Sequence, residues 1–196
     1  KTSSSAAAVF APDKGRLRVL VDGQPVAAEE FDLAPSGANW TARGSVEIKA
    51  ANTAPVRVSA TMLLAPDGAP QSYEWTSQAE KKNGARILFE NGVAKITLQI
   101  QGARPFQQDI DFGSPKIAVL DNNLYHHYAI LALIYDWSKR GSQIFPVLIP
   151  QDLTPGSITV ESTGSQTVAG KSYEGLRVST PDLEVFIYLG AHPRLM

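Results

Sequence analysis

Residues 121–140, with the sequence DNNLYHHYAILALIYDWSKR, are the one stretch of this chain whose pattern strongly predicts a helix. Asp121 or Asn122 can cap its N-terminus, and Gly141 stands where a left-handed residue commonly ends a helix. Apolar residues recur at helical spacing and cover most of its circumference, which predicts a helix that is mostly buried. A single apolar helix in a β protein either fills the core or lines a pocket. This stretch also holds two of the three histidines.

The rest of the chain has the pattern of short strands separated by turns. Asp22–Gly23 predicts a hairpin turn, and residues 56–64 and 71–78 predict a second hairpin. Asn83–Gly84 and Asn91–Gly92 predict two more turns. The other predicted strands cover residues 40–50, 85–90, 93–101, 104–112, 143–149, 157–162, 166–169, 175–179 and 183–189. This rhythm favours a mainly β protein, with a single strongly curved antiparallel sheet (a half-barrel or open barrel) around one buried helix at about 121–140.

Composition limits the classes of function. With 43% apolar and 19% charged residues, the chain has the composition of an ordinary soluble globular protein. A net charge of −1 provides no basic surface for nucleic acid. The absence of cysteine excludes disulfides and thiolate chemistry, and no apolar run reaches the roughly 20 residues that span a bilayer.

The two ends of the chain lead to three further expectations. Residues 1–13 have the composition of a flexible leader with little packing, followed by one β-rich domain over residues 14–196. The start at Lys1 predicts a mature chain whose signal peptide has been removed, and hence a periplasmic or otherwise extracytoplasmic location. The alternation at Arg194–Met196 predicts a strand that is cut short, so that the native chain would continue.

The candidate site lies in the first turns of the predicted helix. Adjacent helical residues point about 100° apart, so His126 and His127 are poorly placed to hold one metal ion, and no metal, cofactor or catalytic residue is predicted. Two interpretations remain: a polar pocket mouth, or one His and one Tyr hydrogen-bonded where the helix meets the sheet, with the other His and Tyr residues at the surface. The residues of the possible pocket mouth are Asp121, Tyr125, His126, His127, Tyr128 and Trp137.

Other polar and aromatic groups favour ordinary structural roles. Asp109 and Asp111 flank Ile110 on a strand, which is typical of a solvent face with the isoleucine inward rather than of a cation site. Asp136 is expected to pair with Lys139 or Arg140. The chain has no G-x-S-x-G elbow, no dinucleotide or phosphate loop and no H-E-x-x-H motif. The strand aromatics that are expected in the core rather than on a ligand platform are Trp40, Tyr73, Trp75 and Phe89.

The order of these segments resembles a known family. The resemblance lies in GRLRVLVDGQPVAAEEF, NNLYHHYAILALIYDW, FPVLIPQ, SITVESTGSQTVAGKSYEGLRVS and LEVFIYLGAHPRLM. They are similar in outline to uncharacterised bacterial envelope proteins of domain of unknown function 3108, whose shape resembles the curved half-barrel of the LolA and LolB lipoprotein carriers. The resemblance implies a fold without a catalytic motif, and a fold alone does not determine function.

Three hypotheses for function follow. The first is a non-enzymatic envelope protein that binds an apolar small molecule or a lipidated protein in the concave face of its sheet. The second is a structural or interaction module with a fully packed core. The third is a hydrolase or isomerase that uses Tyr125, His126, His127 and Asp121 or Asp136. A connected cavity below roughly 300 Å³ would argue against the first.

Overall fold

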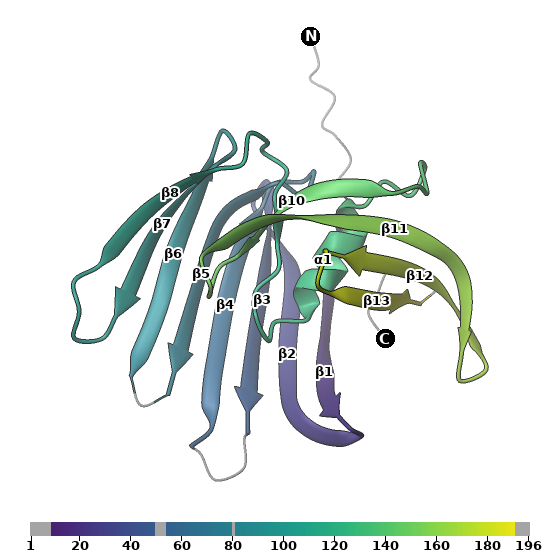
Figure 1. Cartoon of the computed structure of the whole chain (residues 1–196), viewed down its shortest axis with the longest axis horizontal. Helices are drawn as coiled ribbons and strands as arrows, with labels where there is room; N and C mark the ends of the chain where they lie inside the picture. Colours follow the sequence, from purple (N-terminus) through teal and green to yellow (C-terminus); the bar gives the residue numbers. More distant parts are fainter. Residues whose placement is uncertain (1–8, 50–53, 80, 191–196) are drawn as a thin grey trace.

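The computed structural model describes residues 9–49, 54–79 and 81–190 (Figure 1). These ranges contain thirteen strands and one helix, α1 (His126–Ile134). The first sheet consists of β1 (Asp13–Val21), β2 (Gln24–Ser36), β3 (Asn39–Ile48), β4 (Val56–Leu64), β5 (Pro70–Gln78), β6 (Lys82–Glu90), β7 (Val93–Ile100) and β8 (Phe106–Asp111). The second sheet consists of β9 (Ala118–Val119), β10 (Gln143–Ile149), β11 (Thr154–Val168), β12 (Lys171–Ser179) and β13 (Glu184–Leu189).

The first sheet is a meander in which each strand pairs with the next along the chain, always antiparallel. Its hairpin turns follow the sequence signals. Asp22 and Gly23 have φ of 51° and 77°, and Asn91 and Gly92 have φ of 53° and 84°. These positive angles give two-residue turns the twist that matches the flanking strands, so both predicted turns are confirmed. Asn83–Gly84, in contrast, lies inside β6 and not in a turn.

The second sheet has the order β13-β12-β11-β10-β9 and includes one parallel pair, β9 with β10. Its longest strand, β11, replaces the two strands predicted at 157–162 and 166–169. Thr163 is the extra, unpaired residue of a bulge between Ser162 and Gly164, where Gly164 has a φ of 72°. The bulge lets the strand bend without ending, and Figure 1 shows β11 curving over the helix.

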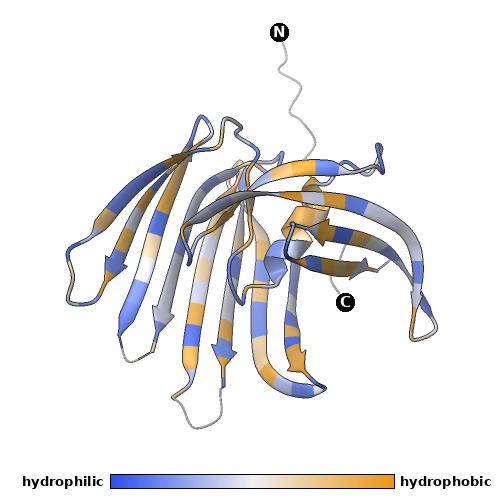
Figure 2. Cartoon of the chain, viewed as in Figure 1, coloured by the Kyte–Doolittle hydropathy of each residue, from blue (hydrophilic) through white to orange (hydrophobic). Residues whose placement is uncertain are grey.

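Helix α1 lies between the two sheets (Figure 1). One side of the helix, with Ile130 and Leu133, packs in a core cluster on the first sheet; the other, with Leu131 and Ala132, packs in a cluster on the second. Along the strands, apolar residues alternate with polar ones (Figure 2), as expected for sheets with one buried face. The fold class is confirmed as mainly β with curled antiparallel sheets, a half-barrel and a buried helix, although the strands divide between two sheets.

The helix is shorter than the predicted 121–140. Asn123 has φ of 64°, which interrupts helical geometry, and the N-terminal cap is Tyr125 rather than Asp121 or Asn122. At the other end Tyr135 is extended, with φ −64° and ψ 132°. Gln143 of β10 then exchanges hydrogen bonds with the backbone of Asp136, at 3.0 and 2.9 Å, which holds the chain away from the helix axis.

The described part of the predicted leader packs on the first sheet. The backbone N–H of Val9 donates to the carbonyl of Pro66 at 3.0 Å, and Phe10 is buried against Trp40, with ring centroids 5.7 Å apart. Residues 9–13 thus differ from the expectation of little packing, because Phe10 is a core side chain. Residues 1–8 and the predicted strand at Arg194–Met196 lie outside the described residues. No helix in the described ranges is long and apolar enough to cross a membrane.

Candidate functional site

Glu29 of β2 holds the start of the helix. Its carboxylate accepts hydrogen bonds from the backbone N–H groups of Tyr125, at 2.7 Å, and His126, at 3.2 Å. Its other oxygen lies 2.5 Å from Nδ1 of His126. Glu29 is fully buried and His126 is 3% exposed. A carboxylate here satisfies donors that the helix leaves unpaired, and it lies at the positive end of the helix dipole.

Asp121 forms a second polar centre one turn before the helix. Its carboxylate accepts from the hydroxyl of Tyr73 at 2.6 Å and from the backbone N–H groups of Asn122 and Gln151, both at 2.9 Å. Burial raises the pKa of this carboxyl, and these hydrogen bonds partly oppose the rise. Burial and the neighbouring Asp121 raise the pKa of Tyr73 well above its ordinary value. Asp121 therefore ties β5, the helix entry and the loop after β10 together.

His127 joins the two centres. Its Nδ1 accepts from the backbone N–H of Asp121 at 3.1 Å, and its ring lies edge-on to His126 with centroids 4.4 Å apart. Nε2 is buried and has no partner among the described residues. Burial, with a smaller contribution from His126, lowers the pKa of His127 well below its ordinary value. His127 is therefore neutral in the folded protein.

This neutral histidine predicts a loss of stability in mild acid. The unfolded chain binds a proton at His127 near pH 6.5, whereas the folded chain binds it only at much lower pH. His127 therefore does not reduce the free energy of unfolding above about pH 6.5. Below that pH its protonation in the unfolded chain lowers the free energy of unfolding by up to about 1.4 kcal/mol per pH unit. The raised pKa of Asp121 acts in the opposite direction, because the folded chain then binds a proton at this carboxyl more readily than the unfolded chain does.

Urea unfolding between pH 7.5 and 5.5 measures this effect. The variant His127→Asn keeps an acceptor near the position of Nδ1 and cannot titrate, so its free energy of unfolding should depend less on pH than that of the parent protein. Equal pH dependence of the two proteins would contradict a proton-free His127.

Three of the six residues predicted for the pocket mouth line a cavity. The cavity lies between the two sheets beside the helix entry and has a volume of about 620 Å³; we call it the inter-sheet cavity. Asp121, Tyr125 and Tyr128 line it, whereas His126 and His127 point elsewhere. Both histidines are buried and hydrogen-bonded near the helix entry, so neither lies at the surface, and a ligand-binding role for Tyr125 and Tyr128 stays a prediction.

The inter-sheet cavity has one apolar and one polar wall. Val147, Ile158 and Val178 of the second sheet contribute aliphatic side chains. The residues around the helix entry and the loop after β10 contribute amides, hydroxyls and carboxylates: Asn122, Asn123, Tyr125, Tyr128, Gln151 and Asp152. Such a division suits a molecule with an apolar body and a polar end.

Two further residues line the cavity that were not among the predicted pocket residues. Trp75 of β5 is 5% exposed, and its indole Nε1 has no partner within the described ranges. Asn83 of β6 has its Oδ1 buried and equally unpaired. Trp75 was assigned to the core, which its burial confirms, and Asn83 was assigned to a turn. Neither signal could reveal the cavity, because its opposite wall comes from a sheet some 70 residues later in the chain.

The remaining predicted residues lie away from this cavity. The indole of Trp137 donates to the carbonyl of Ala132 at 2.9 Å. Asp136 is at the surface, where Ser138 and Lys139 lower its pKa to about 2 and Lys139 forms the predicted ion pair at 3.0 Å. Ile110 is buried between exposed Asp109 and Asp111, as predicted.

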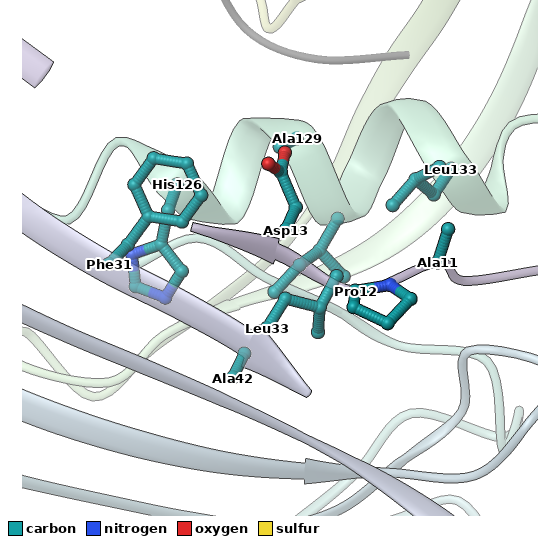
Figure 3. Close-up of a pocket in the computed structure, with 10 residues that line it drawn as sticks. Ala11, Pro12, Asp13, Phe31, Leu33, Ala42, His126, Ala129 and Leu133 are labelled. Carbon is teal, nitrogen blue, oxygen red and sulfur yellow. The ribbon is translucent and has the colours of Figure 1, made fainter. Parts of the chain in front are cut away.

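A second, smaller pocket of about 180 Å³ lies between the other side of the helix and β1–β3 (Figure 3). The ring of His126 stacks on Phe31 at its end, with centroids 5.9 Å apart. Leu33, Ala42 and Leu133 make the rest of its wall mainly apolar. Its volume is below the roughly 300 Å³ typical of the smallest ligand sites.

A wider depression, about 830 Å³, lies over β1–β4 on the face away from the helix. Charged surface residues such as Arg16, Arg18 and Arg57 line it, and Arg57 and Lys49 pair with Glu47 at 3.0 and 3.2 Å. These are exposed ion pairs of a solvated surface, and the inter-sheet cavity is the stronger candidate site.

Comparison with known proteins gives the fold but not the activity. No protein-family model and no curated protein sequence matches this chain. A solved β-barrel-like protein of domain of unknown function DUF1849 from Brucella abortus superposes with a TM-score of 0.58 at 9% identity, over 96% of this chain and 90% of that chain. A DUF1089 family protein from Pseudomonas aeruginosa gives 0.56 at 8% identity, over 91% and 90%. The structural neighbours are thus β-barrel-like domains of unknown function, which confirms the coarse part of the expected resemblance.

Proposed function

We propose that this protein is a non-enzymatic binding protein that holds a small apolar or acylated molecule in the inter-sheet cavity. One observation carries the proposal: the cavity has about 620 Å³, about twice the roughly 300 Å³ that a small ligand needs. The aliphatic side chains of the second sheet would bury the apolar part of the ligand, at about 25 cal/mol for each Å² removed from water.

The half-barrel shape supports the analogy with the LolA and LolB carriers at the level of architecture only. In this chain the helix occupies the concave side of the first sheet, so the space for a ligand lies beside the helix entry and not along the whole sheet. A relationship to domain of unknown function 3108 and a location outside the cytoplasm remain predictions. The similarity of fold leaves the ligand to be determined from the cavity itself.

The geometry gives less support to the hydrolase or isomerase hypothesis. That hypothesis requires two of the five candidate side chains within hydrogen-bond reach in a cleft. Among the described residues no hydrogen bond joins two of those side chains; His126 and Asp121 are bonded to Glu29 and Tyr73 instead. His127 is 1% exposed and does not line the inter-sheet cavity.

Filling the cavity is expected to weaken binding. Ser77 of β5 lines the inter-sheet cavity, and a Ser77→Trp side chain would occupy it. We expect the variant to bind the apolar dye N-phenyl-1-naphthylamine at least about tenfold more weakly than the parent, a loss of about 1.4 kcal/mol. Fluorescence titration measures the affinity.

Gln78→Trp is the matched control, because the neighbouring residue of the same strand is exposed and does not line the cavity. It should bind the dye as the parent does. Val185→Trp fills the same cavity from β13 and guards against a local effect in β5. If both cavity variants keep their circular dichroism spectra and bind normally, or if the parent binds no apolar probe, the proposed function is wrong.

A further inference from the structure

We infer that the inter-sheet cavity selects an uncharged amphiphile whose polar end carries an amide, with Trp75 and Asn83 as its hydrogen-bond partners. This inference rests on the proposed function and adds the chemical class of the ligand. It depends on the charges that line the cavity and on two polar groups in its wall.

The charges of the lining exclude an anionic head group. Among the described residues, the side chains that line the cavity include two carboxylates, Asp121 and Asp152, and no Lys, Arg or His. A buried fatty-acid carboxylate or phosphate would have no cation to pair with and would lie near these two acids. Burying an ion without a partner costs far more than a hydrogen bond returns, so an uncharged head group is favoured.

The two carboxylates are also poor partners for a cation. Asp121 already accepts three hydrogen bonds, from Tyr73, Asn122 and Gln151. Asp152 accepts from Nδ2 of Asn122 at 2.8 Å. The polar wall otherwise consists of amides and hydroxyls, which both donate and accept. Groups of this kind recognise neutral polar ligands.

Trp75 and Asn83 supply one donor and one acceptor side by side. On the inner face of the sheet Trp75 pairs with Ala85, and Asn83 pairs with Ser77, so the two residues occupy neighbouring positions of β5 and β6. Nε1 of Trp75 and Oδ1 of Asn83 are both buried, and neither has a partner among the described residues. An unpaired buried polar group is unusual in a folded protein and destabilises it.

An amide satisfies both groups at once. Its carbonyl oxygen would accept from the indole N–H of Trp75, and its N–H would donate to Oδ1 of Asn83. Protein atoms cover both groups, so the side chains around Nε1 of Trp75 and Oδ1 of Asn83 have to move for a ligand to reach them. A carboxylate lacks the donor that Asn83 requires, and an alkylammonium lacks the acceptor that Trp75 requires.

Three probes with the same ten-carbon chain test the inference: decanamide, decanoate and decylamine. Binding is followed through the indole N–H signals in ¹⁵N–¹H spectra of the full chain. Decanamide should shift the Trp75 signal and leave that of Trp137, whose indole is bonded to Ala132, in place. We expect decanamide to bind at least about tenfold more tightly than decanoate or decylamine.

The variant Trp75→Phe keeps an aromatic ring and removes the donor, and it should reduce or abolish the preference for decanamide. Trp40→Phe is the control, since Trp40 packs on Phe10 away from the cavity. Equal affinity for decanamide and decanoate, tighter binding of decylamine, or an unmoved Trp75 signal would overturn the inference and leave the proposed function intact. Binding of none of the three probes, nor of the apolar dye, would instead contradict the proposed function.

Discussion

Replacing Glu29 by alanine is expected to lower the free energy of unfolding by about 3–5 kcal/mol, the cost typical of breaking a buried polar pair. The substitution leaves Nδ1 of His126 and the backbone N–H groups of Tyr125 and His126 buried without their acceptor. It also leaves an empty space next to Gly44, where the carboxylate lay. Urea unfolding followed by circular dichroism measures the change.

The neighbouring residue provides the control. Glu30 is exposed on the opposite face of β2, so Glu30→Ala should change the free energy of unfolding by less than about 0.5 kcal/mol. The variant Glu29→Gln keeps one acceptor oxygen for the backbone groups and should fall between the two. If Glu29→Ala and Glu30→Ala unfold at the same urea concentration, Glu29 does not hold the helix in place.

Gly44→Ala should also destabilise the protein, although it adds a single methyl group. A Cβ at Gly44 would lie 2.4 Å from Cε1 of His126, 2.7 Å from its Nδ1 and 3.0 Å from Oε1 of Glu29. The ring cannot retreat freely, because it is stacked on Phe31 and bonded to Glu29. We expect a loss of about 1–3 kcal/mol, the range found for overpacked cores.

Gly156→Ala is the matched control in the second sheet. Its added Cβ would lie 3.6 Å from Val147, an ordinary van der Waals contact, so thermal unfolding should change little. A normal melting temperature for Gly44→Ala would show that the helix start can move away from β3. The contacts of Glu29 would then be more adaptable than the structure indicates.

Local chemistry made much of the fold predictable. Asp22–Gly23 and Asn91–Gly92 adopt the positive φ angles that their residue types favour, and the flanking strands follow. The same reasoning failed at Asn83–Gly84, which lies within β6. Close packing, and not a turn, requires glycine at position 84. A Cβ there would lie 2.6 Å from the carbonyl oxygen of Trp75.

The ends of the helix were not predictable because their partners are distant in sequence. Asp121 has the side chain of an N-cap, but Tyr73 and Gln151 occupy its oxygens. The residue that does satisfy the first helical N–H groups is Glu29, about 97 positions earlier, on a strand whose inward glutamate had no local signal. Division of the strands between two sheets is likewise a long-range property that turn patterns do not encode.

The candidate site was predictable only in part. Tyr125 and Tyr128 line the inter-sheet cavity as aromatic residues near a helix start can do, whereas the two histidines became buried structural groups. Trp75 and Asn83 became candidate binding residues because each has a buried polar atom without a partner among the described residues. Only the three-dimensional packing reveals such atoms.

The nearest-neighbour order of the first sheet has a consequence for how the chain assembles. Every pairing in β1–β8 closes a short loop, so this sheet can form by successive local steps with a small entropic cost. The contact of Glu29 with His126 closes a loop of 97 residues and has to await the docking of the helix. We therefore expect the first sheet to form before the contact of Glu29 with His126, and Glu29→Ala to raise the unfolding rate more than it lowers the folding rate.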